Sequence, residues 1–246
     1  MISPYAITFD NLGEVTELQR GEFPEGQPLG RHFSVTRALP RILGLLEELG
    51  LRVTFFVEGL NTELYPDTLG RIAAAGHEVA YHGWCHEQWA ELDRDQEAEI
   101  LERGVRALEA LGLRPEGFRP PGGRLTASSP ELLRELGFAY CSPEGVGFGV
   151  DRDVAVLPFA WPMVDAYHYL PRFGSLRGSS DPASPADFEA VLDAATGSAE
   201  CVVFHPFLAD DEERFAVMRR HLAAVAARGD VWCAPCREVA ARLKAS

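Results

Sequence analysis

Short apolar runs alternate with longer amphipathic segments along this chain, and the alternation predicts β-strands separated by α-helices. The apolar runs that carry the pattern are Tyr5–Phe9, Arg52–Val57, Glu78–Tyr81 and Cys201–Phe204. Helical spacing of apolar positions covers Ser34–Leu49, Thr62–Ala75, Asp93–Leu111, Ser129–Leu136, Pro185–Ala195, Asp211–Ala227 and Cys236–Lys244. Because strands that alternate with helices assemble into parallel sheets, this order predicts an α/β fold with a parallel barrel.

Two segments interrupt the alternation. Leu12–Phe33 is too long for an ordinary connection between a strand and a helix, and long connections in compact domains are usually functional, so we expect it to overhang a site. Cys141–Ser184 is rich in Gly, Pro and Ser and has few periodic runs, which predicts irregular walls around a groove. Ser34 is the expected N-cap of the helix that follows the first segment, and Gly50 its expected end.

Length and composition fit one domain, residues 1–246. The chain has 246 residues, of which 46% are hydrophobic, enough for one large core. Its net charge of −14 argues against nucleic acid and anionic membrane surfaces as partners and favours a neutral or cationic substrate. There is no apolar signal core near Met1 and no stretch long enough to span a membrane, so we expect a cytoplasmic protein.

Two histidines follow one of the predicted strands. His82 and His86 come directly after Glu78–Tyr81, four residues apart, and in a helical segment that spacing places two imidazoles on one face. Two neighbouring imidazoles can bind a divalent metal. Since α/β barrels carry their chemistry at the carboxyl ends of the strands, this pair is a candidate metal site.

Other polar side chains stand at comparable points. Asp10 and Asn11 follow Tyr5–Phe9, and His205 follows Cys201–Phe204. In Gly117–Gly123, Arg119 stands before two prolines and two glycines. The prolines fix the backbone angle φ, and the glycines, which have no side chain, let the backbone approach a ligand closely.

In this order and at these spacings the motifs resemble those of the polysaccharide deacetylases of carbohydrate esterase family 4, from Tyr5 to the last helix. The resemblance implies a distorted (β/α) barrel with about seven parallel strands. It also implies that Asp10 is the general base, that Arg119 orients it, and that His205 is the general acid. Asp165 corresponds loosely to an aspartate that keeps this histidine charged.

The resemblance further implies a divalent metal ion, with zinc expected, held by His82 and His86. Asn11 stands where the family has a third ligand, an aspartate. An amide can offer a carbonyl oxygen, but it lacks the negative charge and should bind the metal more weakly. Four alternatives stay open: Asn11 is a neutral ligand; Asp10 is itself a ligand and another group is the base; Glu14 or Glu58 replaces the missing carboxylate; or no metal binds, as in allantoinase-like relatives. Cys85, between the histidines, is a softer potential ligand.

The implied reaction is hydrolysis of a non-peptide carbon–nitrogen bond that removes an acetyl group from an N-acetylated amino sugar or a related small molecule. The groove walls would include Trp84, Pro121, Gly122 and Trp161. The other possibilities are a hydrolase of cyclic amides and a ligand-binding relative without activity. The sequence does not indicate an oligomeric state.

Cys233 and Cys236 form a Cys-Ala-Pro-Cys string like that of thioredoxins. A thioredoxin fold needs further strands after the helix that follows, and only ten residues follow Cys236. We therefore expect both cysteines to pack a final strand against a final helix. Cys141 and Cys201 are expected in the core.

Overall fold

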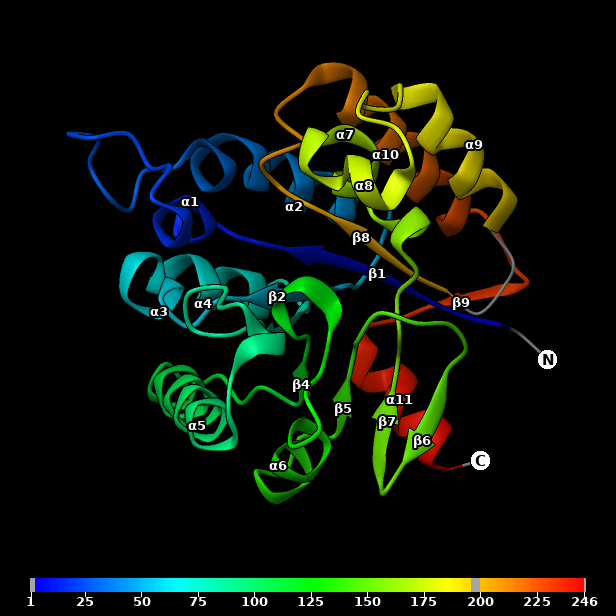
Figure 1. Cartoon of the computed structure of the whole chain (residues 1–246). Coiled ribbons are helices and arrows are strands. Elements are labelled where there is room, and N and C mark those ends of the chain that lie inside the picture. Colours follow the sequence, from blue (N-terminus) through cyan, green and yellow to red (C-terminus); the bar gives the residue numbers. More distant parts are fainter. Residues whose placement is uncertain (1–2, 196–199, 246) are drawn as a thin grey trace.

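A curled sheet of nine strands organises the part of the chain that the computed structural model describes, residues 3–195 and 200–245 (Figure 1). Hydrogen-bonded neighbours follow the order β6-β7-β5-β4-β3-β2-β1-β8, and β9 pairs with β1. The strands are β1 (Ser3–Asp10), β2 (Thr54–Val57), β3 (Glu78–Tyr81), β4 (Gly117–Phe118), β5 (Tyr140–Cys141), β6 (Gly149–Asp151), β7 (Val154–Val156), β8 (Glu200–Phe204) and β9 (Val231–Cys233).

The strand pairs are parallel, except for the antiparallel pair of β6 and β7. The predicted α/β class and the distorted parallel barrel are therefore confirmed. The ladder has β6 at one end and β8 at the other, so the described sheet is a half-barrel rather than a closed barrel. Its longest strand, β1, aligns Phe9 with Phe55 of β2 and with Phe204 of β8, which brings the carboxyl ends of these strands to one edge.

Helices flank the sheet and connect its strands (Figure 1). They are α1 (Val15–Arg20), α2 (Leu39–Glu48), α3 (Asn61–Leu64), α4 (Pro66–Ala74), α5 (Arg94–Ala110), α6 (Ser129–Glu135), α7 (Asp165–Tyr169), α8 (Gly174–Arg177), α9 (Pro185–Ala195), α10 (Glu212–Ala226) and α11 (Cys236–Lys244). Shorter helical turns include η1 (Ser34–Ala38), η2 (Trp89–Glu91), η3 (Pro121–Gly123), η4 (Trp161–Met163) and η5 (Pro171–Phe173). No helix among the described residues is long and apolar enough to cross a membrane.

The core under the site is apolar and aromatic. Ile7, Phe9 and Phe55 are buried, and the rings of Phe9 and Phe55 stack with centroids 4.9 Å apart. Burial of each such side chain contributes about 1.5–3 kcal/mol to folding. The ends of β1, β2 and β8 are thus anchored by close packing, which gives the polar groups beyond them a rigid base.

Two local predictions about helices are wrong. Ser34 is the first residue of a π-helical turn rather than an N-cap, and its Oγ accepts a hydrogen bond from the N–H of Gly13 at 3.1 Å. The helix expected over Thr62–Ala75 is divided at Tyr65 into α3 and α4. The residue that follows is Pro66, and a proline disfavours helical angles in the residue before it.

The two segments without clear periodicity contain more regular structure than predicted. Leu12–Phe33 includes α1, and Cys141–Ser184 includes the β6–β7 hairpin together with α7 and α8. The hairpin turns through Arg152 and Asp153, which both have positive φ. Hairpin turns of this kind usually contain Gly or Asn, so the sequence carried little signal for this one.

The Cys233–Cys236 segment lies at the β9–α11 junction, as expected for a packing role. Both thiols are free, and burial raises the pKa of Cys233 to about 12 and that of Cys236 well above its ordinary value. A reactive dithiol needs a lowered thiol pKa, so the environment does not favour redox chemistry.

Candidate active site

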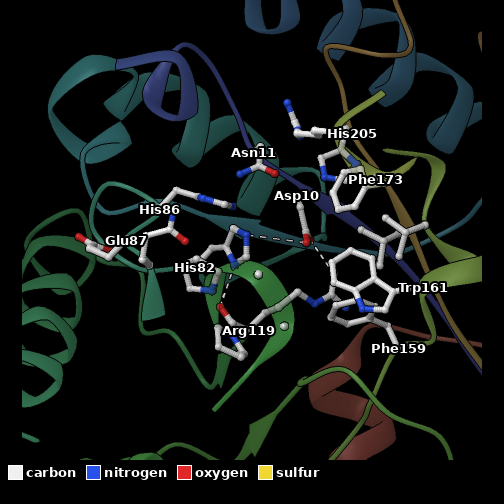
Figure 2. A pocket seen from close by; sticks show the side chains of 18 of the residues that line it. Asp10, Asn11, His82, His86, Glu87, Arg119, Phe159, Trp161, Phe173 and His205 are labelled. Atoms are coloured by element: carbon white, nitrogen blue, oxygen red, sulfur yellow. Dashed lines mark hydrogen bonds and ion pairs between the residues drawn. The ribbon is translucent and has the colours of Figure 1, made fainter. Parts of the chain in front are cut away.

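A cavity of about 360 Å³ opens at the carboxyl ends of the strands (Figure 2). Its lining comes from the end of β1, the loops after β3 and β4, the η4–α8 region and the end of β8. The lining residues include Asp10, Asn11, Gln19, Arg20, His82, His86, Glu87, Gln88, Arg119, Pro121, Gly122, Phe159, Trp161, Arg172, Phe173, Leu176 and His205.

Asp10 and Arg119 form a buried ion pair in the cavity wall. Nη1 of Arg119 donates to Oδ1 of Asp10 at 2.6 Å, and the Arg119 side chain is 1% exposed. The guanidinium also donates to Oγ1 of Thr8 at 2.8 Å and to Oγ of Ser142 at 2.9 Å. It lies 4.0 Å from the centroid of the Phe56 ring. These contacts fix the guanidinium, which in turn fixes the direction of the Asp10 carboxylate.

His82 and His86 lie together, but they do so in a loop rather than in the predicted helix. Their ring centroids are 5.1 Å apart, and the rings meet edge to face. Gly83 and His86 have positive φ, which no helix allows. The Glu87 carboxylate accepts from the backbone N–H groups of Trp84 at 3.0 Å and Cys85 at 2.9 Å, and so holds the loop.

Gly83 is required by the space around this loop. A Cβ atom there would lie 2.6 Å from the Glu87 carboxylate and 2.9 Å from the Pro121 ring. With a φ of 76°, the position also disfavours other residues. The loops after β3 and β4 can therefore pack closely and bring the histidines toward Arg119.

The two imidazoles are neutral at neutral pH. Burial lowers the pKa of His82 to about 3 and that of His86 well below its ordinary value. Nδ1 of His82 donates to the backbone carbonyl of Arg119 at 2.8 Å, which leaves Nε2 on the side of Asp10, 3.9 Å from Oδ2 (Figure 2). A neutral imidazole fixed by its other nitrogen is the form that binds metals in proteins.

Asn11 is held from behind by a buried carboxyl group. Its Nδ2 donates to Oε1 of Glu58 at 2.6 Å, and Nδ2 of Asn61 donates to Oε2 of Glu58 at 3.0 Å. Burial raises the pKa of Glu58 to about 8. The amide nitrogen of Asn11 is thus engaged with Glu58, and its carbonyl oxygen remains available to the cavity that Asn11 lines.

The residues present fit a weakly held divalent ion. Among the described residues, no three His, Cys, Asp or Glu side chains lie close enough together to hold a metal ion. The donors that the cavity offers are the two imidazoles and the carbonyl oxygen of Asn11, which lies beside Asp10. Nitrogen donors with one neutral oxygen suit a borderline ion such as Zn²⁺, with less charge stabilisation than a carboxylate would give.

The other suggested ligands are not placed for this role. Glu14 accepts from the Tyr65 hydroxyl at 2.5 Å and from the N–H of Gly30 at 2.7 Å, and neither Glu14 nor Glu58 is among the residues that line the cavity. Burial raises the pKa of Cys85 to about 11, which keeps its thiol protonated, and Cys85 does not line the cavity either.

Asp165 and His205 form a second buried pair. Nδ1 of His205 lies 2.5 Å from Oδ1 of Asp165, and the backbone N–H of His205 donates to Oδ2 of Asp165 at 2.8 Å. Asp165 begins α7, and His205 follows β8. Two separate hydrogen bonds fix the imidazole relative to the backbone, and His205 lines the cavity opposite the histidine loop (Figure 2).

The predicted groove residues differ in their placement. Pro121, Gly122 and Trp161 line the cavity, whereas Trp84 does not. The Trp84 ring lies 3.5 Å from the Arg103 guanidinium and fills the space beside Gly59. The prediction for Trp84 was therefore wrong, because the loop turns this ring away from the cavity.

Sequence reasoning missed several lining residues. Arg20 comes from α1, and Arg172 and Phe173 come from η5. A weak signal existed for Arg20, since the long Leu12–Phe33 segment was expected to overhang the site. None existed for η5, whose position depends on packing between distant segments.

A curled parallel half-barrel with paired Asp–Arg, His–His and Asp–His groups at its carboxyl edge defines a hydrolase-like site. The family model of the polysaccharide deacetylases matches residues 4–141. The chain belongs to the polysaccharide deacetylase family.

Similar proteins support the assignment. Peptidoglycan deacetylase-like protein FGM2 of Gibberella zeae is 38% identical over 103 residues, which are 41% of this chain and 30% of that protein, so the match spans less than a third of its length. A putative polysaccharide deacetylase from Mycobacterium smegmatis has a crystal structure with a TM-score of 0.86 and 32% identity, covering 99% of this chain and 91% of that one. The Puue allantoinase shares the fold at 21% identity, with a TM-score of 0.76 over 99% of this chain and 90% of that one.

Proposed function

We propose that this protein hydrolyses the amide of an N-acetylated amino sugar or a related small molecule and releases acetate. The observation that carries the proposal is one cavity lined by the Asp10–Arg119 pair, by the His82–His86 pair and by His205, whose imidazole is held by Asp165. Family membership supports deacetylation as the reaction.

The two acid–base groups have separate tasks. Asp10 accepts a proton from the attacking water, and Arg119 holds the carboxylate in the direction required. His205 donates a proton to the leaving nitrogen, and Asp165 keeps the imidazole oriented through Nδ1, so that Nε2 can reach the substrate. These tasks need the two groups on different sides of the scissile bond, and they come from β1 and from the end of β8.

A divalent ion, with zinc preferred, would be held by His82, His86 and the carbonyl oxygen of Asn11. When bound, such an ion would supply polarisation of the acetyl carbonyl. Arg119 serves this part of the site as well, because its backbone carbonyl fixes the His82 ring.

An acetate-release assay tests the proposal. Wild type, Asp10→Asn and His205→Ala are compared on N-acetylated sugars and on cyclic ureides, after chelation and again after addition of Zn²⁺. We expect acetate release that falls about 10²–10⁴-fold in either variant, and that depends on the added ion. Arg124→Gln is the control, because Arg124 is 72% exposed at its side chain and does not line the cavity.

The outcomes separate the alternatives. Ring opening of a ureide without acetate release would favour a cyclic-amide hydrolase. The observation that supports this alternative is the neutral Asn11 at the position where the deacetylases have an aspartate. Acetate release that both variants retain would show that Asp10 and His205 only stabilise the fold. No turnover on any compound would favour a binding protein.

A further inference from the structure

Two arginines that no catalytic role explains face the cavity. Arg20 is the last residue of α1, and Arg172 lies in η5. The two segments are far apart in the sequence, yet both contribute to the same cavity wall. The side chain of Arg20 is 27% exposed, so it is largely covered without being closed off from a ligand.

The charges of these two arginines are poorly compensated. The nearest carboxylate oxygen to Arg20 belongs to the exposed Glu22, at 4.0 Å from Nη1, which is beyond hydrogen-bond distance. Within the described part of the chain Arg172 makes no ion pair within 4.0 Å, although Glu22 also acts on its charge.

The remaining charged groups of the cavity are already engaged. Asp10 is paired with Arg119, whose Nη1 lies 2.6 Å away. Glu87 accepts from two backbone N–H groups of its own loop. The lining thus holds three arginines against two carboxylates, an excess of positive charge in a chain whose net charge is −14.

The two guanidinium groups line the same cavity, and their like charges act on each other. The pKa of Arg172 is lowered to about 10, mainly by burial and secondly by the charge of Arg20, and Arg172 is still charged at neutral pH. Two like charges in a partly buried wall are unfavourable on their own, and an anion between them would remove the repulsion.

An apolar surface continues from the arginines. The ring centroids of Trp161 and Phe173 are 5.2 Å apart, and Arg172 lies 5.5 Å from the Phe173 ring. Leu176, which is 57% exposed, completes this part of the lining. A ligand here would place an apolar or ring face on the aromatic side chains and an anionic group on the arginines.

We propose that Arg20 and Arg172 bind an anionic group, a carboxylate or a phosphate, carried by the same molecule that presents its N-acetyl group to Asp10 and His205. This inference rests on the proposed function and narrows its substrate class. It replaces the expectation of a neutral or cationic substrate, which followed from the net charge of the whole chain. The overall charge describes the surface, whereas recognition depends on the few groups that line the cavity.

The test compares N-acetylglucosamine with its 6-phosphate and with N-acetylmuramic acid, which carries a carboxylate on the same sugar. We expect kcat/KM for at least one anionic compound to exceed that for the neutral sugar about tenfold or more, since charge-assisted bonds to arginine are strong. Whichever anion is preferred identifies the group as phosphate or carboxylate. Arg20→Gln and Arg172→Gln should each raise KM for that anion much more than KM for the neutral sugar. Arg124→Gln, which removes the same charge outside the cavity, should change neither.

Calorimetric binding to the Asp10→Asn variant separates this inference from the proposed function. Equal affinity for neutral and anionic sugars, or a preference that survives both arginine substitutions, would overturn the arginine site even if acetate is released. Arginine-dependent binding of an anion without acetate release from any compound by the wild type would support the arginine site and overturn the proposed deacetylase activity.

Discussion

Replacement of Asn11 by aspartate supplies the carboxylate that the family has at this position, yet we expect it to weaken the protein. Nδ2 of Asn11 donates to Oε1 of Glu58 at 2.6 Å, and Glu58 is fully buried. In Asn11→Asp this donor becomes an oxygen, so that two carboxyl groups face each other. Two full charges at that separation would repel by about 6 kcal/mol with an effective dielectric constant of about 20, so Glu58, whose pKa burial raises to about 8, keeps its proton.

The protein will avoid part of this repulsion by retaining a proton or by small displacements. The donor amide of Asn11 is still lost, and a buried polar group left without its hydrogen-bond partner costs about 1–3 kcal/mol, or more where the group is charged. We therefore expect Asn11→Asp to lower the free energy of unfolding by roughly 3 kcal/mol, a large part of the ~5–15 kcal/mol that stabilises a typical domain.

A second substitution should restore the lost contact. In the Asn11→Asp background, Glu58→Gln supplies an amide nitrogen that can donate to the new carboxylate. Its amide oxygen can still accept from Asn61, which lies 3.0 Å from the Glu58 carboxylate. We expect the double variant to regain most of the lost stability. It should also bind Zn²⁺ more tightly than the wild type, because the new carboxylate at position 11 adds a negative charge near His82 and His86.

Urea unfolding of the wild type, both single variants and the double variant measures the coupling, and competition with a chelating dye measures zinc affinity. Glu58→Gln alone is the matched control, because it changes the same contact without altering the cavity lining. Additive effects in the double variant, or an Asn11→Asp protein as stable as the wild type, would refute the idea that Glu58 orients the Asn11 amide.

Two further substitutions test the buried groups. Arg119→Lys should lower the free energy of unfolding by roughly 3 kcal/mol and reduce turnover, since an ammonium cannot serve Asp10 and Ser142 together as the guanidinium does; an unchanged urea midpoint would contradict this. Nε2 of His221 lies within hydrogen-bond distance of the Tyr5 hydroxyl, at 3.0 Å, and burial lowers the pKa of His221 to about 4, so the native state remains unprotonated where the unfolded chain takes up a proton. Its contribution to stability is present at neutral pH and should fall by up to about 1.4 kcal/mol per pH unit between roughly pH 6.5 and 4. His221→Gln should remove this slope, whereas parallel stability–pH curves for the two proteins would argue against a neutral buried imidazole.

The strand ends could be predicted because the apolar runs before them are continuous and buried. Asp10 ends β1 and His205 follows β8, so each position follows from the end of one strand. Parallel register then brings the two residues to the same edge of the sheet. No knowledge of distant contacts is needed for this step.

The histidine loop could be predicted only in part. The four-residue spacing of His82 and His86 gave the correct neighbours but the wrong backbone, since a loop with positive φ at Gly83 also brings two imidazoles together. The contacts that hold this loop involve Glu87 and Pro121, and the latter belongs to another connection. A local pattern does not contain that information.

The arginine pair could not be predicted for a similar reason. Arg20 and Arg172 line one cavity from segments that are remote in the sequence, and each looks like an ordinary solvated charge in its own stretch of sequence. The net charge of −14 even pointed to the opposite kind of substrate. The net charge of the whole chain does not reveal the sign of the charge that lines a small cavity.

Arg119 connects the acid–base part of the site with the histidine part. Its guanidinium holds Asp10 at 2.6 Å, while its backbone carbonyl accepts from Nδ1 of His82 at 2.8 Å. The first contact depends on the side chain and is lost on substitution, but the second belongs to the backbone and survives it. Arg119 variants should therefore disturb the base while they leave the His82 ring oriented. A displacement of the loop after β4, in contrast, would disturb both contacts of Arg119, the one to Asp10 and the one to His82, so the close packing of that loop against Gly83 helps to keep the two parts of the site in register.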